Sequence, residues 1–174
     1  MRSSKKYTCA ILDTSAILRG NFLDFGRSIP IYTVSSSLRE LKRGVKSFEV
    51  ETLLQMGILK VVDVDRGMRD LARKLARRSG DIRKLSGADI DLIALALYLR
   101  DKGESPLFLT GDYAIQNVLA MAKIDFRSVG QKTIKSALIW NYQCPICRNV
   151  YDMGDTCPRC GTKLIKRAVK AREL

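Results

Sequence analysis

The chain has 174 residues, enough for one core domain and a small appendage. Its 31 Lys and Arg residues against 18 Asp and Glu residues give a formal net charge of +13, which favours a polyanionic partner such as nucleic acid, with mere solubility as the alternative. The sequence contains no histidine, which excludes His-based acid–base catalysis, His-containing zinc sites and Ser-His-Asp triads. No apolar run reaches the ~18–20 residues of a membrane span, and we expect a cytoplasmic protein with no membrane association.

The first predicted strand leads directly to an acidic residue. Residues 9–12 form an apolar run typical of a buried strand, and Asp13 follows them. In a parallel sheet Asp13 would lie at the carboxyl end of its strand, where ligands bind in such folds. Asp13 is therefore either the N-cap of a short helix or a metal ligand, and the arrangement of the other acids decides between these two roles.

Two further strands and two helices are predicted before residue 65. Residues 31–34 and 58–64 are rich in β-branched side chains and predict the second and third strands. The serines after residue 34 suit the N-cap of a helix that carries Glu40 and ends near Gly44. A second helix is predicted over residues 47–56, before the third strand.

Residues 66–78 predict an amphipathic helix with a basic face. Apolar residues recur there at helical spacing, and the basic residues on another face are Arg66, Arg69, Arg73 and Arg77. Only Asp70 lies in this row to neutralise it. The row therefore suits contact with phosphates, and a solvated helix face is the alternative.

The last part of the core begins with a buried helix. Ser86 and Asp89 have the spacing of a capping box, and from residue 90 the helix is apolar nearly all round. The remaining elements are a strand over residues 106–110, a helix over 113–123 and a strand over 126–129. Strands that alternate with helices predict an α/β fold, with a parallel five-stranded sheet and flanking helices.

Four carboxylates are predicted to meet at one edge of this sheet. Asp13 and Asp112 follow buried strands, while Glu40 and Asp89 lie early in helices. Helix N-termini contribute under ~1 kcal/mol each toward holding such charges together, so a divalent cation is needed, and Mg²⁺ or Mn²⁺ suits oxygen ligands. The alternative is three N-caps and one surface glutamate. Asp91 lies about 200° round the helix from Asp89 and is at best an auxiliary ligand.

The composition changes near residue 130, where a second unit is expected to begin. Two CxxC pairs predict closed tetrahedral coordination of one structural Zn²⁺, with the ligands Cys144, Cys147, Cys157 and Cys160. Disulfides are the competing interpretation, and the fifth cysteine, Cys9, is expected in the core. The expected divisions are a core domain over 1–130, a linker over 131–140, a zinc ribbon over 141–165 and a basic tail over 166–174.

The end of the chain is basic. Lys163, Lys166 and Arg167 follow the cysteine pairs, and Trp140, Tyr142 and Tyr151 offer aromatic rings nearby. Basic residues beside aromatic rings predict a nucleic-acid contact, and a frayed, solvated terminus is the alternative.

These residues together carry a family resemblance. The order Asp13-Thr14-Ser15, Glu40, Asp89 ahead of residues 92–96, and Thr110-Gly111-Asp112 resembles the PIN-domain nucleases. The run over 112–117, with a zinc ribbon behind it, is similar to the archaeal Nin-one-binding endonucleases of ribosome assembly. One departure is Gly111, where such relatives often carry a second Asp.

The resemblance implies a PIN-like fold and a metal-dependent, single-strand-specific endoribonuclease. Asp13, Glu40, Asp89 and Asp112 would hold Mg²⁺ or Mn²⁺, and a metal-activated water would attack the scissile phosphate in line. The side chains expected to orient the acids or the water are Ser15, Thr110 and Asn117. The implied substrate is precursor small-subunit rRNA, cleaved at the 3′ end of mature 16S rRNA on a pre-ribosomal particle.

Two other functions are compatible with the sequence. One is a non-catalytic RNA- or ribosome-binding adaptor in which the acids have no catalytic role. The other is a toxin-type PIN ribonuclease acting on tRNA or mRNA, although such toxins usually lack a ribbon.

Overall fold

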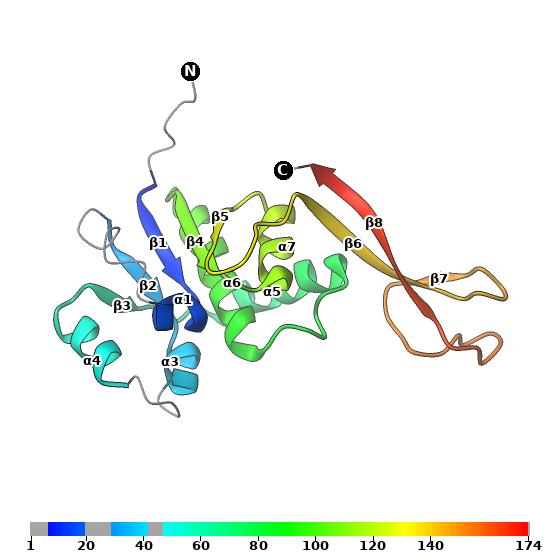
Figure 1. Ribbon diagram of the computed structural model, residues 1–174, viewed down its shortest axis with the longest axis horizontal. Helices are drawn as coiled ribbons and strands as arrows, with labels where there is room; N and C mark the ends of the chain where they lie inside the picture. Colours follow the sequence, from blue (N-terminus) through cyan, green and yellow to red (C-terminus); the bar gives the residue numbers. More distant parts are fainter. Residues whose placement is uncertain (1–6, 20–28, 42–46, 174) are drawn as a thin grey trace, which may run out of the picture.

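A computed structural model of the chain describes residues 7–19, 29–41 and 47–173 (Figure 1). Gly44, which we expected to end a helix, lies outside these residues. None of the helices in the described ranges is both long and apolar enough to cross a membrane.

The core of the molecule is a parallel five-stranded sheet, which confirms the predicted fold class. Its strands are β1 (Cys9–Leu12), β2 (Ile31–Thr33), β3 (Leu59–Val61), β4 (Pro106–Thr110) and β5 (Asp125–Ser128). Their order is β3-β2-β1-β4-β5, and all neighbours are parallel. The chain therefore adds strands outward from β1 on one side and then returns to its other side. Such a reversal creates a crevice at the carboxyl ends of β1 and β4, where open α/β sheets bind ligands.

Helices cover both faces of the sheet. The helices α1 (Thr14–Arg19), α3 (Ser35–Leu41) and α4 (Ser47–Gln55) pack on one face, and α5 (Arg66–Ser79), α6 (Gly87–Asp101) and α7 (Tyr113–Met121) pack on the other. Side chains of β1 alternate between the two layers: Ala10 and Leu12 face the first, Cys9 and Ile11 the second. This alternation follows from the two-residue period of a strand. The burial of Cys9 confirms its predicted place in the core.

Local sequence fixes the ends of the two long helices. Ser86 and Asp89 form the predicted capping box at the start of α6, whose residues are then buried nearly all round. Asp65 caps α5, and Gly80 ends it in the left-handed conformation with φ of 76°.

The C-terminal part of the chain forms a second, antiparallel sheet. Its strands are β6 (Ser136–Gln143), β7 (Val150–Tyr151) and β8 (Ile165–Glu173), in the order β7-β6-β8. Residues 136–143 pair with 165–173 along their length, so β6 and β8 take up much of what we expected to be a linker (131–140) and a basic tail (166–174). The strand β8 is hard to recognise in the sequence because it carries many charged residues. Backbone pairing in a narrow sheet does not require an apolar face, so the alternation typical of a buried strand is missing.

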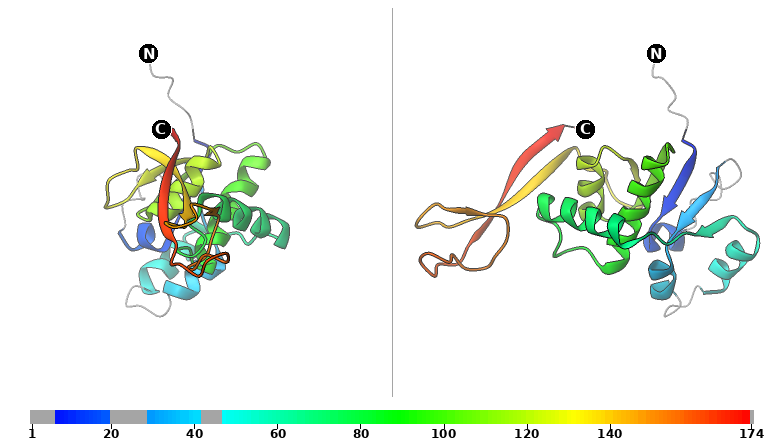
Figure 2. Two further views of the ribbon diagram at one scale, coloured as in Figure 1. Left: turned by 90° about the vertical axis from the view of Figure 1, so that its right-hand side faces the viewer. Right: turned by 180° about the vertical axis from the view of Figure 1, so that it is seen from behind.

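The paired strands β6 and β8 form an arm that leads from the helices to the cysteine knuckles at one end of the long axis (Figure 2). The base of this arm lies directly on the end of α5, where a Cβ added to Gly80 would overlap the Trp140 backbone carbonyl. Arg83 also forms an ion pair of 2.8 Å with Asp155 of the knuckle region. Both contacts fasten the arm to the core.

Candidate active site

The four predicted acids line one cavity at the carboxyl edge of the parallel sheet. Asp13, Glu40, Asp89 and Asp112 reach it from four separate elements, and its volume is about 450 Å³. The other lining residues are Thr14, Ser15, Arg19, Ser86, Gly111, Val129 and Gln131. A second cavity, of about 300 Å³, lies at the opposite edge beside the starts of β4 and β5, where parallel sheets do not place their ligand sites.

Asp13 is held by three hydrogen bonds. Its Oδ1 accepts from Ser15 Oγ at 2.8 Å and from the Ala16 amide at 2.6 Å, and its Oδ2 accepts from Thr110 Oγ1 at 2.5 Å. The carboxylate is buried, with 5% of the residue exposed. Asp13 therefore caps α1 and also lines the cavity, so its capping role does not exclude a role as a metal ligand.

Thr110 connects two of the acids. Its hydroxyl donates to Asp13 and accepts a hydrogen bond of 3.0 Å from the Asp112 amide. Asp112 in turn caps α7, because its Oδ1 accepts from the amides of Ala114 and Ile115. The predicted positions of Ser15 and Thr110 beside the acids agree with these contacts.

The charges of two other cavity acids affect the pKa of Asp89. Burial raises its pKa, and the negative charges of Asp112 and Asp13 add to this increase. The hydrogen bonds that it receives from Ser86 act in the opposite direction and are outweighed. The Asp89 carboxyl is therefore close enough to Asp112 and Asp13 for their charges to disfavour its ionisation, as expected of acids gathered for a cation.

The donor set of the cavity fits a hard divalent cation. Carboxylate oxygens with room for water are the ligands that Mg²⁺ and Mn²⁺ take. Among the described residues, only the four ribbon cysteines form a group of three or more His, Cys, Asp or Glu side chains whose ligand atoms all lie within 4.8 Å of one another. No three of the cavity acids converge to that extent, and Glu40 occupies an exposed position of the short helix α3.

Arg19 lines the cavity although the sequence did not single it out, and Gly111, noted for its missing acid, lines the cavity too. Arg19, at the end of α1, packs its guanidinium against Gly130 and brings a cation to the cavity. Gly111 leaves no space for a side chain, since an added Cβ would lie 2.9 Å from the Val129 carbonyl oxygen. A second acid at position 111 would therefore require the backbone to shift. No short-range pattern marks Arg19, because only the fold brings residues 19 and 130 together.

Two predicted auxiliary residues lie elsewhere. Asp91 is not among the residues that line the cavity: its Oδ1 lies 2.9 Å from Arg69 Nε, and its Oδ2 accepts from Ser36 Oγ at 2.9 Å. Asn117 lies between the end of α5 and the arm. Its side chain donates to Asp81 at 2.6 Å and exchanges two hydrogen bonds of 2.8 Å with the Leu138 backbone of β6. Asn117 therefore fastens β6 to α7 and orients neither an acid nor a water in the cavity.

The predicted basic face of α5 is partly occupied by acids. Arg66 and Arg73 both approach Asp70, at 3.9 Å and 3.2 Å, and Arg69 pairs with Asp91. Arg77 is exposed. The role of this row in binding RNA stays a prediction.

The four ribbon cysteines converge as predicted. The Sγ atoms of Cys144 and Cys160, and those of Cys147 and Cys157, lie 3.5 Å apart, and no cysteine is in a disulfide. Four thiolates around one zinc ion would place their sulfur atoms about 3.8 Å apart. The two knuckles repeat one turn, since Arg148 donates to the Cys144 carbonyl and Gly161 to that of Cys157, both with φ near +60 to +70°.

Aromatic residues support the ribbon. The Tyr151 hydroxyl lies 3.3 Å from Cys157 Sγ and lowers the pKa of that thiol to about 6. The predicted RNA contact Lys166 lies over the Trp140 ring, 4.7 Å from its centroid, and burial lowers its pKa. Lys163 and Arg167 are exposed.

Comparison with known proteins identifies the family of this chain. The family described as the PIN domain of ribonuclease matches residues 10–99. Endoribonuclease Nob1 of Methanothermobacter thermautotrophicus is 33% identical over 90% of this chain and 91% of its own length. Endoribonuclease Nob1 of Methanocaldococcus jannaschii is 31% identical over 93% and 79%, and ribonuclease VapC1 of Thermoplasma acidophilum is 29% identical over 94% and 80%. The chain therefore belongs to the PIN-domain ribonuclease family, and it is related over most of its length to archaeal Nob1 endoribonucleases.

Proposed function

We propose that the protein is a Mg²⁺- or Mn²⁺-dependent, single-strand-specific endoribonuclease of the cytoplasm. The proposed substrate is precursor small-subunit rRNA within a pre-ribosomal particle, cleaved at the 3′ end of mature 16S rRNA. Membership of the PIN-domain ribonuclease family and the relationship to Nob1 endoribonucleases support an RNA substrate. The observation that carries the proposed metal dependence is the gathering of four carboxylates from four separate elements around one cavity.

The four acids would coordinate the ion, and neighbouring side chains orient one of these acids by hydrogen bonds. Asp13, Glu40, Asp89 and Asp112 supply the oxygen donors. A bound ion would supply a Lewis acid that lowers the pKa of a coordinated water and neutralises charge on the phosphate. Ser15 and Thr110 fix the orientation of the Asp13 carboxylate. The excess of positive charge on the chain, +13, favours the approach of RNA to an otherwise acidic cavity.

The ribbon is proposed to carry one structural Zn²⁺ and to contact RNA. The four convergent thiols support the zinc site, because Zn²⁺ in structural sites is typically held by four such ligands. Lys163, Lys166 and Arg167 are the proposed RNA contacts of the ribbon, and the exposed arginines of α5 are those of the core.

The relationship to VapC1 supports a second candidate substrate. A toxin-type ribonuclease would cleave tRNA or mRNA with the same acids. Incubation of the protein with tRNA, with mRNA and with an RNA that spans the mature 3′ end of 16S rRNA separates the two. The proposed function requires a defined cut in the rRNA fragment at concentrations that leave the other RNAs intact.

The decisive experiment combines chelation with one conservative substitution. The rRNA fragment is incubated with wild-type protein and Mn²⁺, with EDTA added, and with Asp13→Asn protein. We expect EDTA to abolish cleavage and Asp13→Asn to slow it at least about 100-fold, because the variant loses a metal-binding charge while keeping its shape. Affinity for a non-cleavable RNA should change less than about twofold, since RNA affinity rests on phosphate contacts elsewhere.

A matched acid provides the control. Asp101 lies on α6 like Asp89 but pairs with Arg100 at 2.9 Å, away from the cavity, so Asp101→Asn should cleave at the wild-type rate. Cleavage that survives EDTA would contradict the metal mechanism. Absence of cleavage by the wild-type protein, with RNA binding intact, would instead favour the adaptor function.

A further inference from the structure

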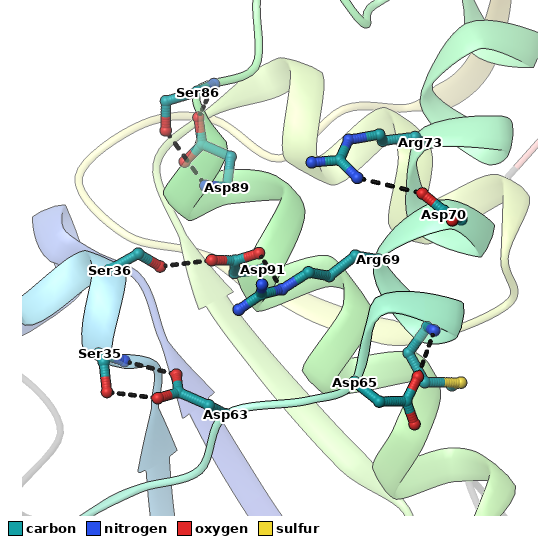
Figure 3. Close-up of polar contacts among 11 residues, drawn as sticks. Ser35, Ser36, Asp63, Asp65, Arg69, Asp70, Arg73, Ser86, Asp89 and Asp91 are labelled. Carbon is teal, nitrogen blue, oxygen red and sulfur yellow. Dashed lines mark hydrogen bonds and ion pairs between the residues drawn. The ribbon is translucent and has the colours of Figure 1, made fainter.

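Asp91 forms a bridge between two helices. Figure 3 shows its carboxylate between Ser36 of α3 and Arg69 of α5. Ser36 Oγ donates to Oδ2 at 2.9 Å, and Arg69 Nε lies 2.9 Å from Oδ1. The Asp91 side chain is largely buried, with 14% exposed, so this ion pair is screened less than one on the surface. The bridge therefore joins α3, α5 and α6 at one point.

The two helices joined by the contact between Ser36 and Asp91, α3 and α6, each also carry an acid that lines the cavity. Glu40 lies four residues after Ser36 on α3, and residues four apart lie on the same face of a helix. Asp89 lies two residues before Asp91 on α6, about 200° away round the axis, so one of these acids faces the cavity and the other the bridge. The contact that draws Ser36 toward α6 therefore turns the Glu40 face of α3 in the same direction.

The short helix α3 depends on such contacts for its orientation. It has seven residues, too few to be stable alone, and it buries Leu38 and Leu41 against the sheet. Apolar burial is non-directional and leaves rotation about the helix axis weakly fixed. The polar contacts of its first turn are Ser36 with Asp91 and Ser35 with Asp63. Of these two, only the first reaches the helix that carries Asp89.

Arg69 gives the bridge its charge balance. Asp91 is a carboxylate two residues from Asp89, and an unpaired charge there would add to the repulsion among the cavity acids. The ion pair with Arg69 neutralises this charge, while the other oxygen of the carboxylate accepts from Ser36. Arg69 is thus used within the core rather than presented to a ligand.

We propose that Asp91, held by Arg69, is a positioning residue that orients Glu40 through Ser36 and so sets the affinity of the cavity for its divalent ion. This inference rests on the proposed metal-dependent function. It assigns the bridge a purpose beyond packing, because no three of the four acids bring their oxygen atoms within 4.8 Å of one another, and their separation is set by the elements that carry them.

The test measures Mn²⁺ binding directly, on the zinc-loaded full chain without RNA, by isothermal titration calorimetry. Ser36→Ala removes the link and should raise the Kd for Mn²⁺ about tenfold, the equivalent of one hydrogen bond. Ser36→Thr keeps the hydroxyl and should restore the Kd to within about twofold of wild type. Asp91→Asn keeps an acceptor for Ser36 but loses the ion pair, and its Kd should rise about fivefold.

A matched serine and a double variant separate positioning from simple stabilisation. Ser35→Ala removes a hydroxyl from the same turn, and its contact with Asp63 does not reach α6, so the Kd should change less than about twofold. Ser36→Ala should have no further effect on the Kd in a Glu40→Gln background, because the residue through which it acts is already neutral.

The outcomes distinguish this inference from the proposed function. If the wild-type protein binds Mn²⁺ no better than Asp13→Asn protein, the metal site and the inference both fail. If wild-type binding is normal and Ser36→Ala binds equally well, or if its effect persists with Glu40→Gln, the positioning role fails while the metal site stands.

Discussion

The protein contains two clusters of side chains of the kinds that bind metal ions, and the two are built in opposite ways. The four ribbon cysteines come from two short turns, and their ligand atoms already lie within 4.8 Å of one another. The four cavity acids come from elements spread from residue 13 to residue 112 and line a cavity of about 450 Å³ without such convergence. The first arrangement leaves no open position, as in a structural site, whereas the second leaves room for water and a substrate phosphate.

The difference also concerns what holds each cluster in place. The cysteines depend mainly on their own knuckle turns and on Tyr151. The acids depend on the whole sheet, because Asp13 is fixed by Thr110 of a neighbouring strand and Glu40 by the orientation of α3. Loss of metal should therefore unfold the ribbon, while the cavity should keep its shape without an ion.

The largest effect is expected from removing two cysteines. Cys144→Ser with Cys147→Ser should abolish zinc binding and unfold the ribbon, because a structural zinc site contributes about 10–16 kcal/mol of apparent binding energy to folding. Elemental analysis should fall from about one zinc per chain to none, and near-UV circular dichroism should show loss of structure around Trp140 and Tyr151.

Cys9→Ala is the control for this comparison. It removes a cysteine that is buried in the core, so zinc content should stay unchanged. Full zinc content in the double Ser variant would show that the cysteine cluster is not the zinc site.

A smaller effect is expected from Thr110→Val. This change keeps the shape of the side chain but removes the donor to Asp13 Oδ2 and the acceptor of the Asp112 amide. Loss of a residue that orients a ligand typically costs 10–100-fold in metal affinity or activity, and we expect a fall in cleavage rate in that range, about tenfold or more.

Thr33→Val tests whether this effect is specific to the acids. Thr33 is also buried at the end of a strand, but its hydroxyl donates to the Leu12 carbonyl and to neither acid. It should lower stability without changing the Mn²⁺ concentration needed for half-maximal cleavage. Equal kinetic losses in the two variants would contradict a specific role for Thr110.

The smallest effect on either cluster is expected from Asn117→Ala, which weakens the connection between the core that carries the acids and the arm that carries the cysteines. The variant leaves the buried Asp81 carboxylate and the Leu138 backbone without their partner and should lower the free energy of unfolding by about 2–3 kcal/mol. Zinc content and the cleavage of a short RNA should change little, because Asn117 contacts neither cluster.

Urea unfolding of Gln143→Ala provides the comparison for Asn117. Gln143 makes one exposed hydrogen bond to the Arg148 carbonyl, and its loss should cost less than about 0.5 kcal/mol. A large loss of short-RNA cleavage in Asn117→Ala would instead support the role predicted from the sequence, in which this residue orients the acids or the water.

The sequence predicted the core sheet because its signals are local. Apolar runs end on Asp13 and Asp112, the capping box of Ser86 and Asp89 starts α6, and the spacing of the cysteines defines the knuckles. Strand β8 was missed because its basic residues hide the pattern that a strand buried on one face would show. The third strand, predicted over 58–64, is only Leu59–Val61 because its pairing with β2 ends there.

The site was predictable to the extent that strand ends determine it. Asp13, Glu40, Asp89 and Asp112 do line one cavity, because parallel strands bring their carboxyl ends to one edge. The partners of Asp91 and Asn117 were not predictable, because Arg69, Ser36 and Leu138 approach them only through tertiary packing. Periodicity says which face of a helix a residue occupies, but not which element lies opposite that face.

At Gly80 the backbone at the end of α5 lies so close to Trp140 of β6 that there is no space for a side chain. A single methyl group at position 80 would lie 2.6 Å from the Trp140 Cβ and act as a wedge under the arm. The first cysteine lies four residues beyond this point, about 13 Å along an extended strand, and the knuckles reach further still. A side chain at position 80 would therefore displace β6, and with it the cysteine knuckles, relative to the core.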